Sequence, residues 1–278
     1  MNYRHSYHAG NFADVFKHTV LSLLLQSLHA KEKPFCYLDT HAGAGLYDLH
    51  ATPAQKTGEY RQGIGHFWGT QNVPQEMAGY LSAVHAINED DALRYYPGSP
   101  RIARHFLRPQ DRMVLMELHP EEAHALKQEF RGDAQVHVHE MDGFLGLKGF
   151  LPPPERRGLV LIDPPFERTD DFEQLLEGLK TAHQRWSTGI YALWYPLKDW
   201  QVVQRFHQQL VASGLRKLLL AEIQLHAEPL PGQLFGCGMI IMNPPWRLDE
   251  TLQNLLPKLM AGLHAAKGRV RVEWLVPE

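Results

Sequence analysis

Short continuous apolar runs along the chain alternate with stretches in which apolar residues recur at every third or fourth position. The first stretch of helical spacing covers residues 11–29, with Asn11 as a candidate N-cap. Runs typical of strands lie at residues 35–39, 113–117, 136–139, 159–162, 190–195, 218–225, 239–242 and 270–276. A further helix is predicted through Leu252, Leu255, Leu256 and Leu259. This alternation of strands and helices predicts an α/β fold with a parallel-dominated sheet.

The run at residues 159–162 is apolar without alternation, which is typical of a strand covered on both faces by helices. It ends in Asp163, Pro164, Pro165 and Phe166. Two successive prolines remove two N–H donors and push Asp163 out of the helical region, so backbone carbonyls beside its carboxylate are left as unpaired acceptors. Two such acceptors suit both N–H bonds of an exocyclic amine, and Phe166 suits the flat ring that carries the amine.

A turn with two glycines, Asp39-Thr-His-Ala-Gly-Ala-Gly45, follows the first predicted strand. Glycines occur at such a turn where the backbone must approach a ligand closely. The turn is a poor dinucleotide fingerprint, because the third glycine of GxGxxG is missing and Asp48 would face a pyrophosphate unfavourably. A cofactor without phosphates, S-adenosylmethionine, fits better.

The first two predicted strands are separated by more than sixty residues, far more than one crossover helix and its loops require. Apolar residues near helical spacing within this segment predict a small helical subdomain rather than a linker. We place the inserted subdomain at residues 47–109 and the core of the fold at residues 1–46 and 110–278.

A basic helix is predicted near the end of this insertion. Ser99 is its candidate N-cap and Pro100 its first helical residue. The residues that make one side of it basic are Arg101, Arg104, His105 and Arg108. That side is either salt-bridged surface or a contact for RNA phosphates.

Composition narrows the class of protein. The 278 residues are 44% hydrophobic and 21% charged, as in ordinary globular domains. No apolar run approaches the roughly 20 residues of a membrane helix, and the N-terminus lacks the apolar centre of a signal peptide, so we expect a cytoplasmic protein. Cys36 and Cys237 lie in apolar segments without CxxC spacing and are predicted to be buried thiols. The net charge of -3 argues against binding of nucleic acid by the whole surface. Any nucleic acid is therefore expected to bind to a basic patch on one face of the protein.

Asp14, Lys17 and His18 fall on one face of the first helix, at i, i+3 and i+4. Such a stripe is either a solvated surface or part of a site. With other His and Asp residues it also motivates a rival function, a metal-dependent hydrolase, although no ligand spacing such as HExxH is present. The candidate ligands of that rival are His5, His8, Asp14, His18, Asp39, His41 and Asp163.

Six segments of the sequence resemble the bacterial 23S ribosomal RNA adenine-N6 methyltransferases of the RlmJ family. They are residues 3–14, 17–18, 38–45, 96–100, 117–120 and 162–165. Residues 163–166 also resemble the Asp-Pro-Pro-Tyr loop of amino-group methyltransferases, with Phe166 in place of the usual tyrosine. The resemblance runs nearly end to end. It implies a Rossmann-like class I methyltransferase fold, with a mostly parallel seven-stranded sheet and helices on both faces.

The same resemblance implies S-adenosylmethionine as the cofactor, 23S ribosomal RNA as the partner, a monomer, no metal and no membrane. The residues that it assigns to the cofactor are His18, His41, Ser99, Glu117, Asp142, Gly143 and Asp163. Asp163 is also the implied catalytic residue, and Tyr3 is the implied RNA contact. The loop itself predicts that Pro164 and Phe166 bind the substrate, with the adenine N6 attacking the methyl group in line while Asp163 and the Pro164 carbonyl accept its N–H bonds.

Asn243-Pro-Pro-Trp246 is a second candidate for the amine site. Ligands of open α/β sheets bind at the carboxyl ends of the parallel strands, near the point where the strand order reverses. In the fold that the resemblance implies, the strand before Asp163 lies there beside the first strand, whereas the strand before Asn243 is antiparallel and ends at the opposite edge. We therefore prefer Asp163. A catalytically inactive RNA-binding relative is a further alternative, because Phe166 lacks the tyrosine hydroxyl.

Overall fold

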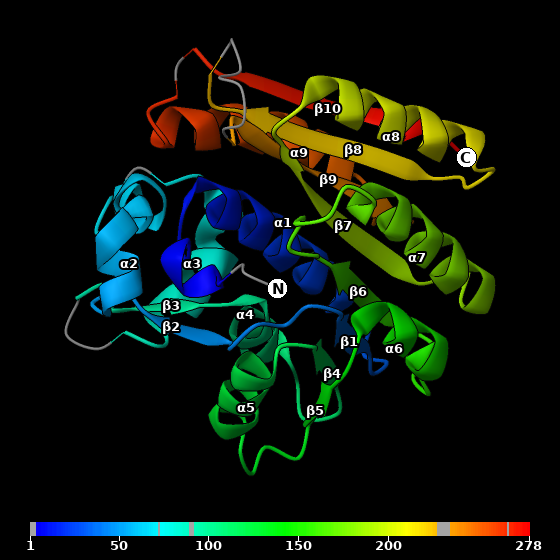
Figure 1. Cartoon of the computed structure of the whole chain (residues 1–278), viewed down its shortest axis with the longest axis horizontal. Coiled ribbons are helices and arrows are strands. Elements are labelled where there is room, and N and C mark those ends of the chain that lie inside the picture. Colours follow the sequence, from blue (N-terminus) through cyan, green and yellow to red (C-terminus); the bar gives the residue numbers. More distant parts are fainter. Residues whose placement is uncertain (1–3, 72, 89–91, 227–233, 266) are drawn as a thin grey trace.

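The computed structural model describes residues 4–71, 73–88, 92–226, 234–265 and 267–278. It contains an eight-stranded sheet with the strand order β10-β8-β9-β7-β6-β1-β4-β5 (Figure 1). The strands of this sheet are β1 (Cys36–Asp39), β4 (Arg112–Glu117), β5 (Val136–Glu140), β6 (Gly158–Ile162), β7 (Ile190–Leu197), β8 (Leu218–Gln224), β9 (Gly236–Met242) and β10 (Arg269–Val276). The helices that flank it are α1 (Phe12–Leu28), α4 (Ser99–Phe106), α5 (Pro120–Glu129), α6 (Gly143–Phe150), α7 (Asp171–Arg185), α8 (Trp200–Ala212) and α9 (Leu248–Gly262).

The parallel part of the sheet is arranged around β1. Cys36 of β1 pairs with Arg112 of β4 on one side and with Gly158 of β6 on the other, both in parallel register. Beyond these neighbours, β5 and β7 extend the parallel set in opposite directions. The strand order therefore reverses between β1 and β6, so the loops after these two strands lie next to each other at the carboxyl edge.

The predicted fold class is confirmed, but the sheet has eight strands where seven were expected. The count of seven came from the family resemblance, whereas the sequence pattern itself predicted eight runs, the last at residues 270–276. That run forms β10, which pairs antiparallel with β8 at the edge of the sheet. Without β10, β8 would expose a row of unpaired N–H and C=O groups. In β10 the charged residues Arg269, Arg271 and Glu273 alternate with apolar ones, a pattern that suits an edge strand with one solvated face.

Helices cover both faces of the sheet (Figure 1). The buried side chains of α1, α9 and the inserted segment form one hydrophobic core, and those of α6, α7 and α8 form a second. Leu159 and Leu161 of β6 enter the first core, whereas Val160 and Ile162 enter the second. Successive side chains of a strand point to opposite faces, so a strand between two cores is apolar at every position.

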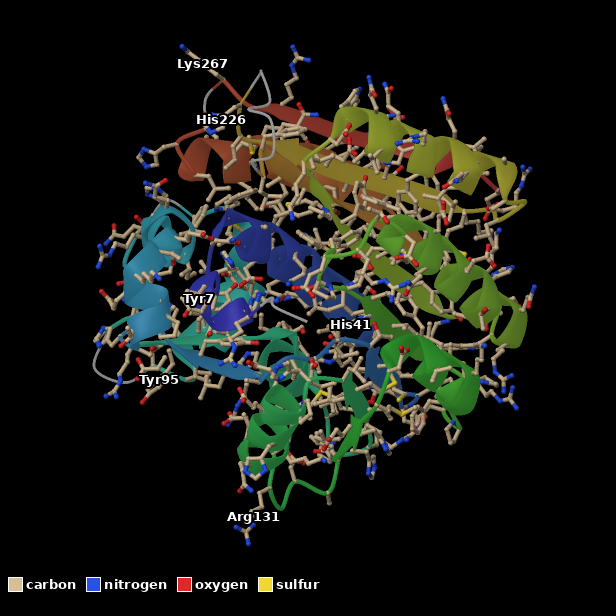
Figure 2. The ribbon with its side chains drawn as sticks, in the orientation of Figure 1. Tyr7, His41, Tyr95, Arg131, His226 and Lys267 are labelled. Atoms are coloured by element: carbon tan, nitrogen blue, oxygen red, sulfur yellow. The ribbon has the colours of Figure 1, made fainter. Side chains whose placement is uncertain are left out.

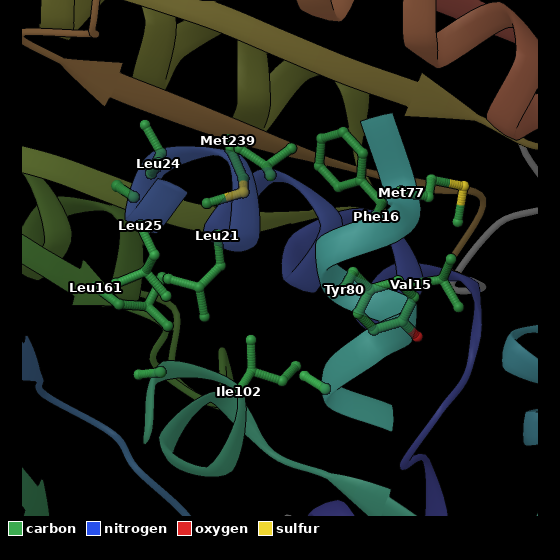
Figure 3. Close-up of a cluster of buried hydrophobic side chains, with 14 of the residues drawn as sticks. Val15, Phe16, Leu21, Leu24, Leu25, Met77, Tyr80, Ile102, Leu161 and Met239 are labelled. Atoms are coloured by element: carbon green, nitrogen blue, oxygen red, sulfur yellow. The ribbon is translucent and has the colours of Figure 1, made fainter. Parts of the chain in front are cut away.

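The first helix, α1, is enclosed on nearly all sides. Figure 3 shows it between the sheet, which supplies Leu161 and Met239, and the inserted segment, which supplies Tyr80. Its predicted N-cap is confirmed, because the side chain of Asn11 accepts hydrogen bonds from the backbone N–H groups of residues 13 and 14.

Because α1 is enclosed, its stripe of polar residues, Asp14, Lys17 and His18, is buried. Asp14, Lys17 and His18 are 2%, 6% and 1% exposed, so the solvated-surface interpretation was wrong. The sequence pattern alone does not reveal this burial, because a stripe of charges at i, i+3 and i+4 looks the same whether water or a folded segment covers it.

The inserted segment contains a small sheet as well as helices. Its elements are β2 (Leu46–Asp48), α2 (Thr52–Thr57), α3 (Ala78–His85), β3 (Tyr95–Pro97) and the 3-10 helices η2 (Glu59–Gln62), η3 (Ile64–His66) and η4 (Gln75–Met77). The pairing of β2 with β3 was not predicted, because three-residue strands are too short to show a period of two. The next helix, α4, packs against both β1 and β4. The division of the chain into a core and an inserted subdomain stays a prediction.

Two local predictions need correction. Ser99 is the first residue of α4 and Gly98 is its N-cap, which leaves the Ser99 hydroxyl free to bond elsewhere. The strand β7 does not stop at residue 195, where the predicted run ends, but continues through Pro196 to Leu197. The pairing of β7 with β6 stops at Leu193, so beyond that point one side of β7 lacks a neighbouring strand and tolerates a residue without an N–H.

Both cysteines are free and buried, as predicted. Within the described ranges, none of the helices combines the length and the apolar character needed to span a bilayer.

Leu161→Ala tests the central packing. Leu161 is fully buried between the sheet and α1, so we expect a loss of about 2–5 kcal/mol in the free energy of unfolding. The matched control is Leu145→Ala, because Leu145 is 59% exposed. Urea denaturation of both variants measures the difference. Equal effects of the two substitutions would contradict the packing described here.

Candidate active site

A cavity of about 1270 Å³ opens at the carboxyl ends of the parallel strands, next to the reversal of strand order. Its lining comes from α1, from the turn after β1, from the loops that follow β4, β6 and β7, and from the inserted segment. Pockets for one small molecule usually measure roughly 300–1,000 Å³. The cavity is therefore large enough for a cofactor together with part of a second molecule.

The turn after β1 brings the backbone to the edge of this cavity. Gly43 has a φ of 61°, a left-handed conformation that favours glycine. A Cβ atom on Gly43 would also lie 2.3 Å from the hydroxyl oxygen of Tyr47, so a larger residue does not fit. The N–H of Gly43 donates a 2.8 Å hydrogen bond to Oε2 of Glu117. The turn and the end of β4 are thus joined directly.

Glu117 is the last residue of β4 and lines the cavity. Its Oε1 accepts a 2.7 Å hydrogen bond from the N–H of His119, while Oε2 is held by Gly43. Two backbone donors fix the orientation of the carboxylate, and each oxygen keeps a further lone pair. This arrangement can accept hydrogen bonds from two neighbouring hydroxyl groups of a ligand.

Lys17 joins α1 to the loop after β6. Its Nζ atom lies 2.6 Å from Oδ2 of Asp163 and 3.0 Å from Oδ1 of Asp14. The three side chains are 8%, 17% and 2% exposed, in the order Lys17, Asp163, Asp14. The ring of Trp194, from β7, lies 5.8 Å from Nζ. One cation is thus held between two carboxylates in a largely dehydrated place.

Asp14 is also tied to the segment before α1. Its Oδ2 accepts hydrogen bonds of 2.9 Å from the N–H of Gly10 and from Nε2 of His5, which lies in the 3-10 helix η1 (His5–Tyr7). Burial by itself would raise the pKa of Asp14, but the charges of His5 and Lys17 outweigh it and hold the pKa well below its ordinary value. Asp14 therefore stays ionised and holds Lys17 in place.

Asp39 ends β1 in a different environment. Its Oδ2 accepts 2.7 Å hydrogen bonds from the hydroxyl groups of Tyr37 and Ser99, and its Oδ1 accepts a 3.2 Å bond from the N–H of His41. Burial raises the pKa of Asp39 to about 6, because these neutral donors only partly offset the loss of water. Asp39 holds the turn and the start of α4 together.

Two histidines of the predicted cofactor set line the cavity. Nδ1 of His18 lies 2.8 Å from the hydroxyl oxygen of Tyr96, and its buried Nε2 has no hydrogen-bond partner among the described residues. Burial lowers the pKa of His18 well below its ordinary value. The ring of His41 packs edge-on against Phe144 at 5.3 Å, and burial lowers its pKa too. Both rings are therefore neutral near pH 7.

The loop after β6 has the features expected of an amine site. No described residue donates a hydrogen bond to Oδ1 of Asp163 or to the carbonyl of Pro164, and both residues line the cavity. Phe166 has a φ of 50°, which is rare for a bulky residue and is often found at functional sites. Its ring lies 5.8 Å from the ring of Trp194 in an edge-on arrangement.

The remaining predicted site residues lie in other positions. Asp142 is the N-cap of α6 and accepts a hydrogen bond from the N–H of Leu145. A Cβ on Gly143 would lie 2.1 Å from the carbonyl oxygen of Thr40, so the start of α6 packs closely on the turn after β1. Neither Asp142 nor Gly143 is among the described residues that line the cavity. Tyr3 lies outside the described residues.

The second candidate loop, residues 243–246, lies at the other edge of the sheet from the cavity. Asn243 follows β9, which runs antiparallel to β7. Its side-chain amide donates to the carbonyl oxygens of Ser187 and Gly189, just before β7 begins. Asn243 therefore lies at the opposite edge from Asp163, as expected for an antiparallel strand.

The basic side of α4 is paired with acids from neighbouring segments. Arg101 bonds Glu129, Arg104 lies 2.5 Å from Asp133, and Arg108 lies 2.8 Å from Asp111. Of the two interpretations of that basic side, these contacts favour a salt-bridged surface over a contact for RNA phosphates. Across the described ranges, no group of three or more His, Cys, Asp or Glu side chains is arranged to hold a metal ion.

Sequence reasoning missed the ion-pair partner of Asp163, Lys17, and the ring beside that partner, Trp194. Lys17 was recognised only as part of a polar stripe, and Trp194 only as part of a strand. The signal for Trp194 was available, because it lies near the carboxyl end of a parallel strand beside the reversal point. The pairing of Lys17 with Asp163 joins residues 146 positions apart and has no signal in one sequence.

Comparison with known proteins identifies the family. A family model described as "Ribosomal RNA large subunit methyltransferase D, RlmJ" matches residues 32–276. The chain belongs to this family. Relatives named "Ribosomal RNA large subunit methyltransferase J" are 47% identical in Escherichia coli and 43% identical in Haemophilus influenzae, and each alignment covers 100% of both chains. The family resemblance seen in the sequence is therefore confirmed.

A solved structure from Legionella pneumophila is similar to this member of the family in fold as well. It has a TM-score of 0.90 and 36% identity, and the match covers 96% of this chain and 98% of that chain. Family membership makes the protein a methyltransferase, a class of enzymes that commonly uses S-adenosylmethionine.

The raised pKa of Asp39 predicts a specific pH dependence of stability. Its pKa is about 6 in the folded protein and about 3.8 when unfolded, so the folded state holds the proton more tightly. The stability that this proton contributes is fully present below about pH 4 and is lost as the pH rises through 6. We expect Asp39→Asn, which does not titrate, to gain about 3 kcal/mol relative to the wild type between about pH 4 and 7.

Urea denaturation of the wild type and Asp39→Asn at several pH values, at constant ionic strength, measures this difference. Contributions from other titrating groups cancel in the comparison. A difference that stays constant over this pH range would contradict the raised pKa.

Proposed function

We propose that this protein transfers a methyl group from S-adenosylmethionine to the N6 amino group of an adenine in 23S ribosomal RNA. The observation that carries the proposal is the pair of open acceptors after β6, Oδ1 of Asp163 and the carbonyl of Pro164, in a cavity at the reversal of strand order. The names of the relatives support the same reaction class. We further propose that one chain is the catalytic unit and works in the cytoplasm, where ribosomal RNA is found.

The inner part of the cavity fits S-adenosylmethionine. The fixed carboxylate of Glu117 suits two ribose hydroxyls. The buried Nε2 of His18 finds no partner among the residues that the structure describes, and a polar atom of the ligand can supply one. His41 and Ser99 line the same region. Asp142 and Gly143 complete the proposed set from the start of α6. When bound, the cofactor supplies an electrophilic methyl group on a sulfonium centre.

The chief obstacle to the reaction is the weak nucleophilicity of N6, because its lone pair is conjugated with the adenine ring. Oδ1 of Asp163 and the Pro164 carbonyl accept the two N–H bonds and favour a pyramidal nitrogen. They also stabilise the positive charge that develops on nitrogen as the new C–N bond forms. Much of the remaining acceleration comes from positioning. After the transfer, the cationic N6 gives up its extra proton to water.

Lys17 positions Asp163 for this task. It contacts Oδ2 and leaves Oδ1 open, so one carboxylate oxygen is held while the other meets the amine. Its positive charge also offsets part of the cost of burying that carboxylate.

The target base must leave its helix to reach these acceptors. Bases that undergo such chemistry are extruded and stacked between aromatic or apolar side chains. Phe166 lines the cavity next to Asp163 and Pro164, so it is the proposed stacking partner of the adenine. The proposed stacking needs only the face of the ring, which phenylalanine and tyrosine both provide.

Asp163→Ala is expected to reduce methyl transfer to ribosomal RNA by ~100-fold or more, because it removes one acceptor and a negative charge from the amine site. Cofactor affinity should stay within a few fold, because most of the proposed cofactor contacts remain. Transfer of tritium from labelled S-adenosylmethionine to RNA measures the first quantity, and calorimetry the second.

The matched control for this experiment is Asp170→Ala. Asp170 precedes α7 and bonds Arg168 and Gln174, the latter within that helix. This variant should methylate at the wild-type rate. Mapping of N6-methyladenine in the product identifies the reaction. Wild-type turnover by Asp163→Ala would exclude the proposed role.

Lys17→Met tests the positioning of Asp163. It leaves two carboxylates without their cation, so we expect the free energy of unfolding to fall by about 3–5 kcal/mol. We also expect kcat to fall by ~10-fold or more, because a 1 Å misplacement of a reacting group can cost this much. Steady-state kinetics should show a larger effect on kcat than on KM for RNA.

If the methionine variant does not fold, Lys17→Arg distinguishes the effect of the positive charge at position 17 from the effect of its exact location. It keeps the cation but moves the donor atoms, so it should fold and still show a reduced kcat. Unchanged kcat in both variants would rule out a positioning role for Lys17.

A further inference from the structure

The cavity has an outer end that the proposed chemistry does not use. Its cationic and titratable side chains come from four separate segments, the 3-10 helix η3, the loop after β7, the end of β8 and the connection from α9 to β10. They are His66, Lys198, His226, His264 and Lys267. Figure 2 places His226 and Lys267 at one end of the molecule and Arg131 at the opposite end.

Charge separates this outer end from the inner part of the cavity. The carboxylates among the described lining residues are Asp14, Glu59, Glu117, Glu122 and Asp163. None of them lies on the four segments that carry the outer cationic residues. Asp199, which follows Lys198, caps α8 by accepting a 2.8 Å hydrogen bond from the N–H of Gln201. In the part of the chain that the structure describes, neither Lys198 nor Lys267 forms an ion pair.

Two of these residues form a stacked histidine pair. The rings of His66 and His264 are 4.4 Å apart and inclined by 26°. Burial and the neighbouring His264 lower the pKa of His66. Positive charge on His66 is therefore unfavourable unless an anion lies close to the stacked pair. A phosphate group is an anion that can accept hydrogen bonds from such rings and from lysines.

Apolar side chains lie among these cations. Leu225 and Leu234 flank the connection from β8 to β9, and Leu263 precedes His264. Cations interleaved with apolar surface suit a single nucleic-acid strand, because its phosphates take the charges and its bases and sugars cover the apolar groups. A free small anion would bind to the cations alone and would leave the apolar side chains uncovered.

We propose that this outer end binds the RNA strand next to the target adenine, with Lys198 and Lys267 on its phosphates and the His66–His264 pair beside them. The inference rests on the proposed function, because it assigns a path to the RNA that enters the same cavity. It places the strand between the inserted segment and the described residues after β7, at the end of β8 and before β10, so the insertion contributes directly to substrate binding.

The test is the double variant Lys198→Ala/Lys267→Ala. Both lysines are exposed, so folding should be unchanged, and thermal unfolding checks this. At moderate salt we expect KM for ribosomal RNA to rise by ~10-fold or more, with kcat and cofactor affinity within about threefold. Loss of two phosphate contacts should also reduce the slope of log affinity against log salt by about 1.4, since single strands contribute about 0.7 per contact.

The matched control is Arg131→Ala/Lys148→Ala, which removes two exposed cations that do not line the cavity. It should keep the wild-type KM and salt slope. If the wild type methylates RNA and the test variant behaves like this control, the outer end does not bind the strand. Loss of cofactor affinity in the test variant would also overturn the inference. Absence of methylation by the wild type would instead overturn the proposed function.

Discussion

The ion pair between Lys17 and Asp163 is the contact on which the arrangement of the site depends. It joins the first helix to the loop after β6, two segments that are distant in the sequence. Charges in such a dehydrated place are costly unless each one is paired. Asp14 provides the second partner of Lys17, and His5 and Gly10 hold Asp14 in turn. A chain of paired groups therefore fixes the direction of one carboxylate oxygen.

The fold leads to this pairing through the position of α1. The sheet covers one side of this helix and the inserted segment covers the other, so the side chains of its polar stripe are buried and line the cavity. Asp14 is then paired with His5, Gly10 and Lys17, and Lys17 in turn meets Asp163 at the edge of the sheet. The long insertion thus serves the site indirectly, because it encloses the helix that carries Lys17.

Much of this architecture was predictable from the sequence, and the reasons for success and failure are physical. A strand between two cores is apolar at each position. The sequence therefore located β6 and the loop that follows it, which contains Asp163 and Pro164. Helical spacing and a capping residue located α1. The same pattern could not show that the stripe of Asp14 and Lys17 is buried, because burial depends on a segment folded back from elsewhere in the chain. The pair β2–β3 and the continuation of β7 through Pro196 depend on neighbouring strands in the same way.

Two aspartates at the ends of adjacent strands show how environment assigns different tasks to the same residue type. Asp39 is bonded by neutral hydroxyl groups and its pKa is raised to about 6, so it suits a structural role in the turn. Asp163 is bonded by a cation and keeps an oxygen open to the cavity. Environments that differ in this way commonly separate the roles of paired acids in enzymes.

The same separation applies to the cavity as a whole. Its inner end gathers carboxylates, which favour a sulfonium cofactor and an amine that becomes positive during the reaction. Its outer end gathers lysines and histidines, which favour a polyanion. A uniformly acidic cavity would repel RNA, and a uniformly basic one would repel the cofactor and destabilise the charge that develops on N6. Because the two ends differ in sign, a chain with a net charge of -3 can bring a cationic donor and a polyanionic acceptor into one site.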